Sequence, residues 1–224
     1  PTGAGKTLAG FLPSLLDLAA RPSRKGMRKP GIHTLYISPL KALAVDVARN
    51  LTSPAEEMGL DVRIETRTGD TPAARRQRQK RIPPDIMLTT PEQLALLLSH
   101  VDADRFFGGV KRVIFDELHA LVTYKRGDLL ALGLARLRKL APDLVTTGLS
   151  ATVADPDALA GWLSPQNSQQ APAADIVTVT GGAAPDISIL ESEERLPWAG
   201  HMARYAFGEV LEAIAAHGTT LVFV

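Results

Sequence analysis

The residues at the start of the chain are of the kinds that bind phosphate groups. Residues 1–8 read PTGAGKTL and lead into apolar residues at helical spacing. Two glycines allow the backbone to curl so that successive N–H groups point at one anion, and the helix that follows adds its positive end. Lys6 can then neutralise the outer phosphates, while the Thr7 hydroxyl can hold Mg²⁺. Taken alone, the same letters also fit an ordinary helix start.

Two carboxylates follow the apolar run at 113–115. An acid directly after a buried strand suits Mg²⁺ held partly through water, which makes Asp116 a candidate metal ligand beside Thr7. Glu117 suits a base, or an orienting group, for a water that attacks a terminal phosphate. The alternative is a helix N-terminus that merely favours acids. Because the glycine-rich loop is in the same chain, we favour phosphate chemistry.

His119 is an ambiguous signal by itself, because a single histidine is more often an ordinary surface or core residue. It lies just beyond Glu117, at the predicted end of a strand. Ser150 and Thr152 follow the next strand along the chain. We therefore predict that His119 hydrogen-bonds to one of these two hydroxyl groups.

The segment 75–81 is strongly basic, with five cations in the sequence RRQRQKR. It fits contact with a phosphate backbone, and it equally fits a solvated helix face. Arginines at 75, 76 and 78 do not all share one helical face, so the sequence does not separate the two interpretations. The basic segment 24–29 is predicted to be mainly solvated surface.

The bulk composition excludes several classes of protein. The 224 residues allow one large domain, or one domain and part of a second. A hydrophobic content of 45% supports a sizeable core, and a net charge of +1 confines any nucleic-acid site to a local patch. The sequence has no cysteine, which excludes disulfides and thiolate metal sites and fits a reducing compartment. No apolar run approaches the ~18 residues that span a bilayer, so we predict a cytoplasmic protein without a membrane partner.

Strand and helix patterns alternate over the first 163 residues, which is typical of an α/β fold with a parallel sheet. Strands are expected at 34–37, 62–66, 85–89, 110–115 and 144–149, and helices at 6–18, 41–51, 72–81, 91–98, 128–140 and 156–163. A further turn of helix is expected at 54–58. The candidate residues follow the strands, where ligands bind in open α/β sheets. We predict one domain over 1–163, a linker at 164–175, and a second, partial domain over 176–224 with strands at 176–179, 187–190 and 220–224 and a helix near 201–217.

Taken together, six motifs resemble those of the superfamily 2 helicases in order and spacing. Residues 1–7 resemble motif I, 38–43 motif Ia, 68–70 and 89–92 the further strand-gripping motifs, 116–119 a DExH box (motif II), and 150–152 motif III. The stretches 36–46, 66–75 and 125–132 resemble the large helicase-related group. The run at 91–98 resembles the ligase-associated DExH-box branch.

The resemblance implies a RecA-like P-loop parallel sheet with helices on both faces, plus the start of a second RecA-like lobe. It implies an ATP-dependent helicase that uses ATP and Mg²⁺ and moves on a nucleic-acid strand, DNA in preference to RNA. The implied ATP-binding residues are Thr2, Gly3, Ala4, Gly5, Lys6, Thr7 and Leu8, with Lys6, Asp116 and Glu117 catalytic and Thr7 and Asp116 on the metal. Coupling residues are His119, Ser150, Ala151 and Thr152, and nucleic-acid contacts are Pro39, Lys41, Gly69, Asp70, Thr90, Pro91 and Glu92.

The same resemblance carries expectations about activity and setting. The ligase-associated branch implies DNA repair, with a ligase or nuclease as partner. The loop pattern expects a further small residue and a central strand before Pro1, and an arginine finger from a later motif. Such a finger contributes roughly 10³–10⁵-fold to turnover, so the chain alone is expected to hydrolyse ATP poorly. An RNA-remodelling ATPase and an inactive fragment that binds nucleotide or nucleic acid are the alternatives.

Overall fold

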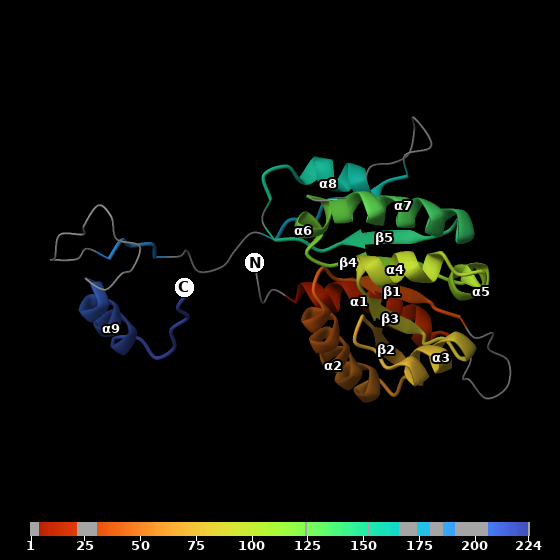
Figure 1. The fold of residues 1–224 in the computed structure, drawn as a ribbon, viewed down its shortest axis with the longest axis horizontal. Helices are drawn as coiled ribbons and strands as arrows, with labels where there is room; N and C mark the ends of the chain where they lie inside the picture. The colour runs from red at the N-terminus through yellow and green to blue at the C-terminus, as the bar shows by residue number, and fades with distance from the viewer. Residues whose placement is uncertain are drawn as a thin grey trace. The chain divides into compact units, whose positions relative to one another are not determined.

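The computed structural model describes residues 5–21, 31–123, 125–151, 153–165, 174–179, 186–190 and 206–223. Its contacts divide the chain into two units, residues 1–180 and 181–224 (Figure 1). The first unit contains the sheet, and the described part of the second contains the helix α9 (Phe207–Ala215). The predicted division into a lobe, a linker and a second lobe stays a prediction.

The first unit is built on a parallel sheet of five strands in the order β2-β3-β1-β4-β5. The strands are β1 (Thr34–Ile37), β2 (Ile64–Arg67), β3 (Ile86–Thr89), β4 (Arg112–Phe115) and β5 (Val145–Gly148). Each of β1, β3 and β4 reads as an apolar run and is almost wholly buried, as expected for strands covered on both faces. The predicted α/β fold is confirmed.

The last residues of the five strands lie side by side. Ile37 pairs with Thr89 on one side and with Phe115 on the other. Thr89 pairs in turn with Arg67, and Phe115 with Gly148. The segments that follow all five strands therefore begin at one edge of the sheet, which is where the candidate residues were predicted to meet.

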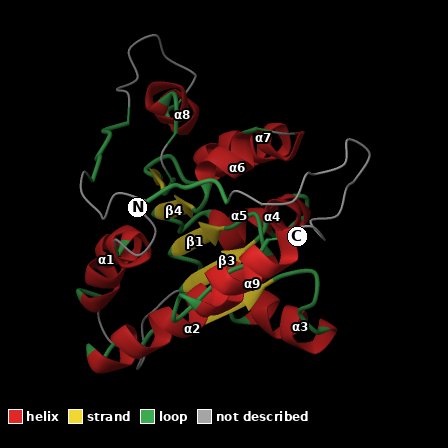
Figure 2. Cartoon of the chain, turned by 90° about the vertical axis from the view of Figure 1, so that its left-hand side faces the viewer, coloured by secondary structure: helices red, strands yellow, loops and turns green. Residues whose placement is uncertain are grey.

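Helices cover both faces of the sheet, as Figure 2 shows. Along β1, Leu35 and Ile37 belong to one buried cluster and Tyr36 to the other, because successive side chains of a strand alternate. The Tyr36 face is covered by α1 (Lys6–Ala19) and α2 (Lys41–Glu57). The opposite face is covered by α4 (Pro91–Leu98), α5 (Ala103–Phe107), α6 (Leu118–Val122), α7 (Lys125–Leu140) and α8 (Pro156–Leu163).

Helix α2 joins the helix predicted at 41–51 with the turn predicted at 54–58, because it continues through Pro54 to Glu57. A proline inside a helix removes one hydrogen bond and crowds the preceding turn, which is why the sequence prediction divides the helix before Pro54. Burial of Ala55 beside Leu51 in the core favours the extra turn. Gly59 follows the end of the helix, with a left-handed φ of 65° and an N–H that bonds to the Glu56 carbonyl, as in a common helix terminator.

Two kinds of element differ from the sequence prediction. Helices α5 and α6 were not predicted, since five residues are too few to show a helical period. Residues 176–179, 187–190 and 220–223 have no regular secondary structure, so the predicted strands there are wrong. Their apolar side chains are exposed, Val177 by 87% and Ile189 by 90%, and a strand needs both a partner and a buried face. Among the described residues, no helix has the length and apolar character to cross a membrane.

Candidate functional site

The described end of the glycine-rich loop lies against the segment that follows β5. Gly5 has a left-handed backbone, with φ 71°, and stands immediately before α1. A glycine adopts this conformation without the steric cost that other residues meet. Lys6 begins the helix, and its Nζ donates a hydrogen bond to the Ser150 carbonyl at 3.1 Å. Thr7 is half-buried and Leu8 exposed in the next positions, while Thr2, Gly3 and Ala4 lie outside the described residues.

The carboxylate pair after β4 forms a tight turn into α6. Glu117 is the one described residue other than glycine with a positive φ, at 48°. A left-handed backbone at such a residue costs of order 1–3 kcal/mol, and such strain is concentrated at functional sites. Asp116 stabilises the turn, because its Oδ1 accepts a hydrogen bond from the Glu117 N–H at 3.0 Å. Both carboxylates are half-buried at the edge where the five strands end.

Tyr36 holds the other oxygen of the Asp116 carboxylate. Its hydroxyl donates a hydrogen bond to Asp116 Oδ2 from the neighbouring strand β1. The Tyr36 ring is buried and stacks on Phe11 of α1, with the ring centres 5.3 Å apart. Burial and the hydrogen bond to Asp116 raise the pKa of Tyr36 well above its ordinary value, so the hydroxyl remains a donor. The sequence prediction missed this residue, which looks like one more apolar position in a buried strand.

His119 lies between the two strand-end segments, as predicted. Its Nδ1 is 2.9 Å from Ser150 Oγ, and its Nε2 is 3.6 Å from Glu117 Oε2. A proton on Nε2 would serve both contacts, with the serine hydroxyl donating to Nδ1. The predicted hydrogen bond to Ser150 is present, while the coupling role of these residues stays a prediction. Ala151 is exposed, and Thr152 lies outside the described residues.

The oxygen atoms of this site suit Mg²⁺. The Thr7 hydroxyl and the Asp116 carboxylate are hard donors of the kind that this ion prefers. The described residues contain no cluster of three or more His, Cys, Asp or Glu that would form an all-protein metal site. Mg²⁺ usually keeps several waters and binds through one or two carboxylates together with phosphate oxygens, so one carboxylate is sufficient.

The predicted nucleic-acid contacts after β1 and β2 are joined by an ion pair. Lys41 Nζ lies 3.0 and 3.1 Å from the two carboxylate oxygens of Asp70, and both side chains are exposed. A Cβ added at Gly69 would lie 3.3 Å from this Lys41 nitrogen, so glycine leaves room for the pair. These three predicted residues therefore form one surface.

The predicted contacts after β3 differ in their exposure. Thr90 and Pro91 are buried at the start of α4, and Thr90 occupies the N-cap position without a capping hydrogen bond from its side chain. Glu92 is exposed and accepts a hydrogen bond from Arg126 Nε at 2.6 Å. Arg126 was not predicted as a site residue, because nothing in the sequence connects it with position 92.

The basic helix α3 (Ala73–Arg81) supports the loop at 68–71. Arg76 donates hydrogen bonds to the carbonyls of Thr71 at 2.7 Å and of Gly69 at 2.5 Å. Within the loop, the Thr68 N–H bonds to Thr71 Oγ1 at 2.9 Å. Arg76 therefore stabilises the loop that contains Gly69 and Asp70.

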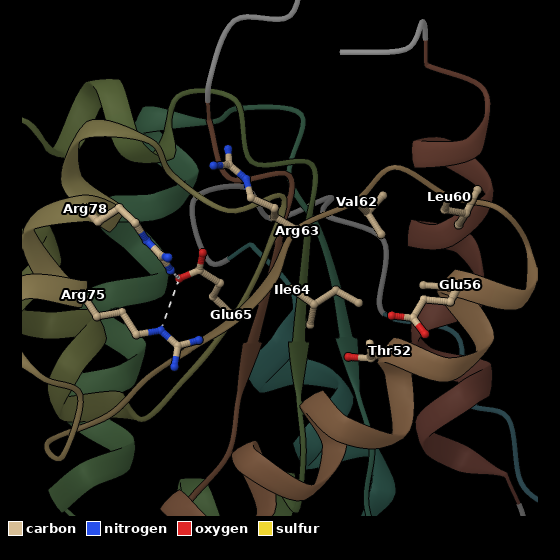
Figure 3. A pocket seen from close by; sticks show the side chains of 10 residues that line it. Thr52, Glu56, Leu60, Val62, Arg63, Ile64, Glu65, Arg75 and Arg78 are labelled. Atoms are coloured by element: carbon tan, nitrogen blue, oxygen red, sulfur yellow. Dashed lines mark hydrogen bonds and ion pairs between the residues drawn. The ribbon is translucent and has the colours of Figure 1, made fainter. Parts of the chain in front are cut away.

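Two further arginines of α3 pair with a buried carboxylate, as Figure 3 shows. Glu65 of the edge strand β2 accepts from Arg78 at 2.8 Å and lies 3.5 Å from Arg75. These side chains line a surface pocket of about 350 Å³ that contains none of the predicted site residues. Neither interpretation of the basic segment describes this arrangement, because Arg75, Arg76 and Arg78 are engaged by acceptors of the protein itself.

The part of the chain that contains these residues matches a known protein family. A family model described as "DEAD/DEAH box helicase" matches residues 1–159, which include every strand of the sheet and all the motifs above. The chain belongs to the DEAD/DEAH box helicase family. The RecA-like α/β lobe that the resemblance implied is confirmed for this helicase chain.

Two curated relatives are similar to this helicase chain over much or all of its length. The ATP-dependent helicase Lhr-Core protein 2 of Thermococcus barophilus is 37% identical over 236 residues, covering 100% of this chain and 27% of the relative. The Lhr helicase/probable uracil glycosylase of Mycolicibacterium smegmatis is 45% identical over 177 residues, covering 74% of this chain and 12% of the relative. The chain thus spans under a third of the length of these relatives.

Two solved structures are also similar. The Mycobacterium smegmatis helicase Lhr bound to ssDNA and AMP-PNP has a TM-score of 0.66 and 44% identity, covering 77% of this chain and 22% of that one. The DUF1998 helicase MrfA bound to DNA and AMPPNP has a TM-score of 0.61 and 32% identity, covering 73% of this chain and 22% of that one.

Proposed function

We propose that the protein carrying this chain is an ATP-dependent DNA helicase or translocase, and that this chain is its ATP-binding lobe. The observation that supports this most directly is that Lys6 and His119 both contact Ser150. His119 also contacts Glu117. These residues come from segments far apart in the sequence, and each is suited to one part of phosphoryl transfer. The structures of the related helicases Lhr and MrfA bound to DNA and AMP-PNP are consistent with the proposal.

Each residue has a defined role in the proposed reaction. Lys6, which contacts the Ser150 carbonyl in this structure, would bind the outer phosphates of ATP. The Thr7 hydroxyl and Asp116 would hold Mg²⁺. The ion, when bound, neutralises charge on the phosphate oxygens. Glu117 orients the water that attacks the terminal phosphate. His119 contacts both Glu117 and Ser150, so it is placed to respond to the state of the nucleotide.

An ATPase assay of the protein carrying this chain, with and without single-stranded DNA, tests the proposal. Glu117→Gln should lower kcat by about 10²–10⁴-fold, as expected for loss of a base or orienting group, and leave nucleotide binding intact. Lys6→Ala should weaken nucleotide binding. Lys139→Ala, which removes an exposed cation from α7, is the matched control. Hydrolysis that DNA does not stimulate, or that survives Glu117→Gln unchanged, would contradict the proposal.

DNA is favoured over RNA because the two related helicases described above are bound to DNA in their structures. The predicted contacts grip a backbone through sugar and phosphate groups, which do not identify the bases. Comparing the stimulation of ATPase activity by DNA and RNA strands of matched sequence separates the two. Equal or stronger stimulation by RNA would favour the remodelling ATPase, and no stimulation by either would favour an inactive binding fragment.

We also propose a cytoplasmic setting in DNA repair, with a ligase or nuclease as partner. This rests on the resemblance of residues 91–98 to the ligase-associated branch, whereas the relatives described above are named Lhr and Lhr-Core helicases. Co-purification of the tagged protein from cells of its source, followed by identification of bound proteins, tests the partner. Recovery of neither a ligase nor a nuclease would count against this part.

A further inference from the structure

One arginine outside the predicted site connects the segments that follow two adjacent strands. Arg126 lies at the start of α7, and its Nε donates to Glu92 Oε1 at 2.6 Å. Its second guanidinium nitrogen donates to the Pro39 carbonyl at 3.0 Å. Pro39 follows β1 and Glu92 follows β3, so one planar group holds two predicted nucleic-acid contacts at a fixed separation. The rigid fork of an arginine suits this double contact, and the single ammonium of a lysine does not reproduce it.

The electrostatics of Glu92 favour the same contact. Burial alone would raise the pKa of this carboxyl, but the hydrogen bond from Arg126 and bonds from backbone and Thr90 outweigh it. The pKa of Glu92 therefore lies below its ordinary value, and the carboxylate is ionised at neutral pH. The Arg126–Glu92 contact is a charge-assisted hydrogen bond, which is among the stronger kinds.

The start of α7, where Arg126 lies, packs closely on α6, the helix that follows the candidate carboxylates. A Cβ added at Gly127 would lie 2.7 Å from the Val122 carbonyl oxygen and 2.9 Å from that of Leu121. Only a glycine therefore allows the first turn of α7 to pack this closely on the last turn of α6. Helix α6 is five residues long and follows directly on Glu117, with His119 in its first turn.

We propose that Arg126 is a positioning residue that links the nucleotide site to the nucleic-acid surface. A displacement of Glu117 or His119 would move α6, and the close contact at Gly127 would pass that movement to Arg126, because close-packed contacts transmit strain. Arg126 would then shift Glu92 and Pro39 together. The inference rests on the proposed function, since it requires that nucleotide and nucleic acid bind to the same protein.

Coupling of this kind has a measurable signature. If nucleotide changes the affinity for a strand by some factor, the strand changes the affinity for nucleotide by the same factor, commonly about 5–150-fold. A residue on the connection alters that factor more than it alters either affinity measured alone. A residue that merely contacts phosphate weakens strand binding equally with and without nucleotide.

Fluorescence anisotropy of a labelled oligo-dT strand, measured with the protein carrying this chain, tests the inference. The ratio of strand affinities with and without AMP-PNP and Mg²⁺ is compared for the wild type, Arg126→Ala and Arg126→Lys. Arg126→Ala should bring the ratio closer to one by about 2–30-fold, the range expected for changes along a coupling connection. Arg126→Lys should recover part of the ratio, and Arg136→Ala, an exposed cation of the same helix, should leave it unchanged.

A second variant changes the other side chain of the Arg126–Glu92 contact. Glu92→Gln keeps the shape of the side chain and removes its charge, so it should shift the ratio in the same direction as Arg126→Ala. The inference would be overturned if both variants kept the wild-type ratio of strand affinities, or lost strand affinity equally with and without nucleotide. The proposed function would still be supported in that case if DNA stimulated the ATPase activity of the wild type. Absence of stimulation in the wild type would overturn the proposed function and the inference together.

Discussion

Glu117 shows how one residue meets two opposing demands. Its side chain is the proposed group that orients water, and its backbone adopts the left-handed conformation that favours glycine. The turn lets Asp116 and Glu117 both lie at the strand edge before α6 begins. Strain of this kind persists only where the surroundings stabilise it, here through the Asp116 hydrogen bond to the Glu117 N–H.

Replacing this residue should therefore separate stability from activity. We expect Glu117→Gly to raise the free energy of unfolding by about 1 kcal/mol, because glycine adopts the left-handed backbone without steric cost. The same change should abolish ATP hydrolysis. Urea unfolding followed by circular dichroism gives the first quantity, and Glu117→Gln is the control that removes the carboxylate but keeps the strain. A glycine variant less stable than the glutamine variant would show that the turn is not strained.

The residues of the site differ in how far the sequence reveals them. Lys6, Asp116, Glu117 and His119 are visible because each follows or precedes an apolar run in a recognisable spacing. Tyr36 and Arg126 are not, because their importance depends on partners 80 and 87 positions away. Composition carries no information about such contacts. The basic segment is the clearest case, since its arginines look free until Glu65 is found beside them.

Close packing between α6 and α7 defines a prediction at the scale of elements. Gly127→Ala should lower the free energy of unfolding by about 1–3 kcal/mol, because the new methyl group would meet backbone atoms that have no room to move. Gly161→Ala is the matched control in α8, where an added Cβ meets nothing within 4 Å. That change should stabilise by roughly 0.5–1 kcal/mol through helix propensity. Denaturant melts of the two variants measure whether the free energy of unfolding falls in Gly127→Ala and rises in Gly161→Ala. Equal changes in the two variants would contradict the packing argument.

The contact between β2 and α3 should make stability depend on pH. Burial would raise the pKa of Glu65, but hydrogen bonds from Gln79 and Arg78 and the charges of Arg78 and Arg75 lower it below its ordinary value of 4.5. A lowered pKa in the folded state means that the stabilisation is present above the unfolded value and is lost as the pH falls through the folded one.

Measurement of the free energy of unfolding against pH tests this prediction. At neutral pH, Glu65→Gln should be less stable than the wild type by about 1–2 kcal/mol, the cost of weakened hydrogen bonds at a buried group. The difference should shrink as the pH falls below about 4.5, where the wild-type carboxyl takes up its proton. Asp143→Asn, an exposed carboxylate paired with Lys111, is the control and should show little difference at any pH. A constant difference for Glu65→Gln would rule out the ion pair as its cause.

The sequence predicted a helix or strand correctly where the spacing of its apolar residues and its length indicated the same kind of element. Strands β1 and β3 are short apolar runs, and α4 and α8 begin with proline, so their bounds follow closely from the sequence. Pro54 divides α2 into two predicted helical segments, which form one helix because Ala55 is buried in the core. Helices α5 and α6 are too short to show a helical period in the sequence. The apolar stretch at 187–190 has the composition of a strand, but the described structure gives it no partner strand.

At the scale of the whole molecule, the two units should be separable. Both buried clusters are formed by residues between 11 and 174, all within the first unit. The described residues of α9 include none that is buried. Removing 181–224 should therefore leave the urea midpoint of residues 1–180 unchanged. Urea melts of residues 1–180 and of residues 1–224, measured in parallel, test this prediction. A lower midpoint for the shorter chain would mean that the second unit stabilises the first.

The common ending of the five strands also restricts how this family can change in length. Because Arg67, Thr89, Ile37, Phe115 and Gly148 are in register, each motif begins at a fixed count from its strand. One residue gained or lost inside a strand would turn the side chains of that strand to the other face of the sheet. It would also displace the motif that follows the strand in the sequence. Insertions and deletions among distant members should therefore collect in the crossovers that approach a strand. An engineer who exchanges segments between members should cut there, and should leave each strand attached to the residues that follow it.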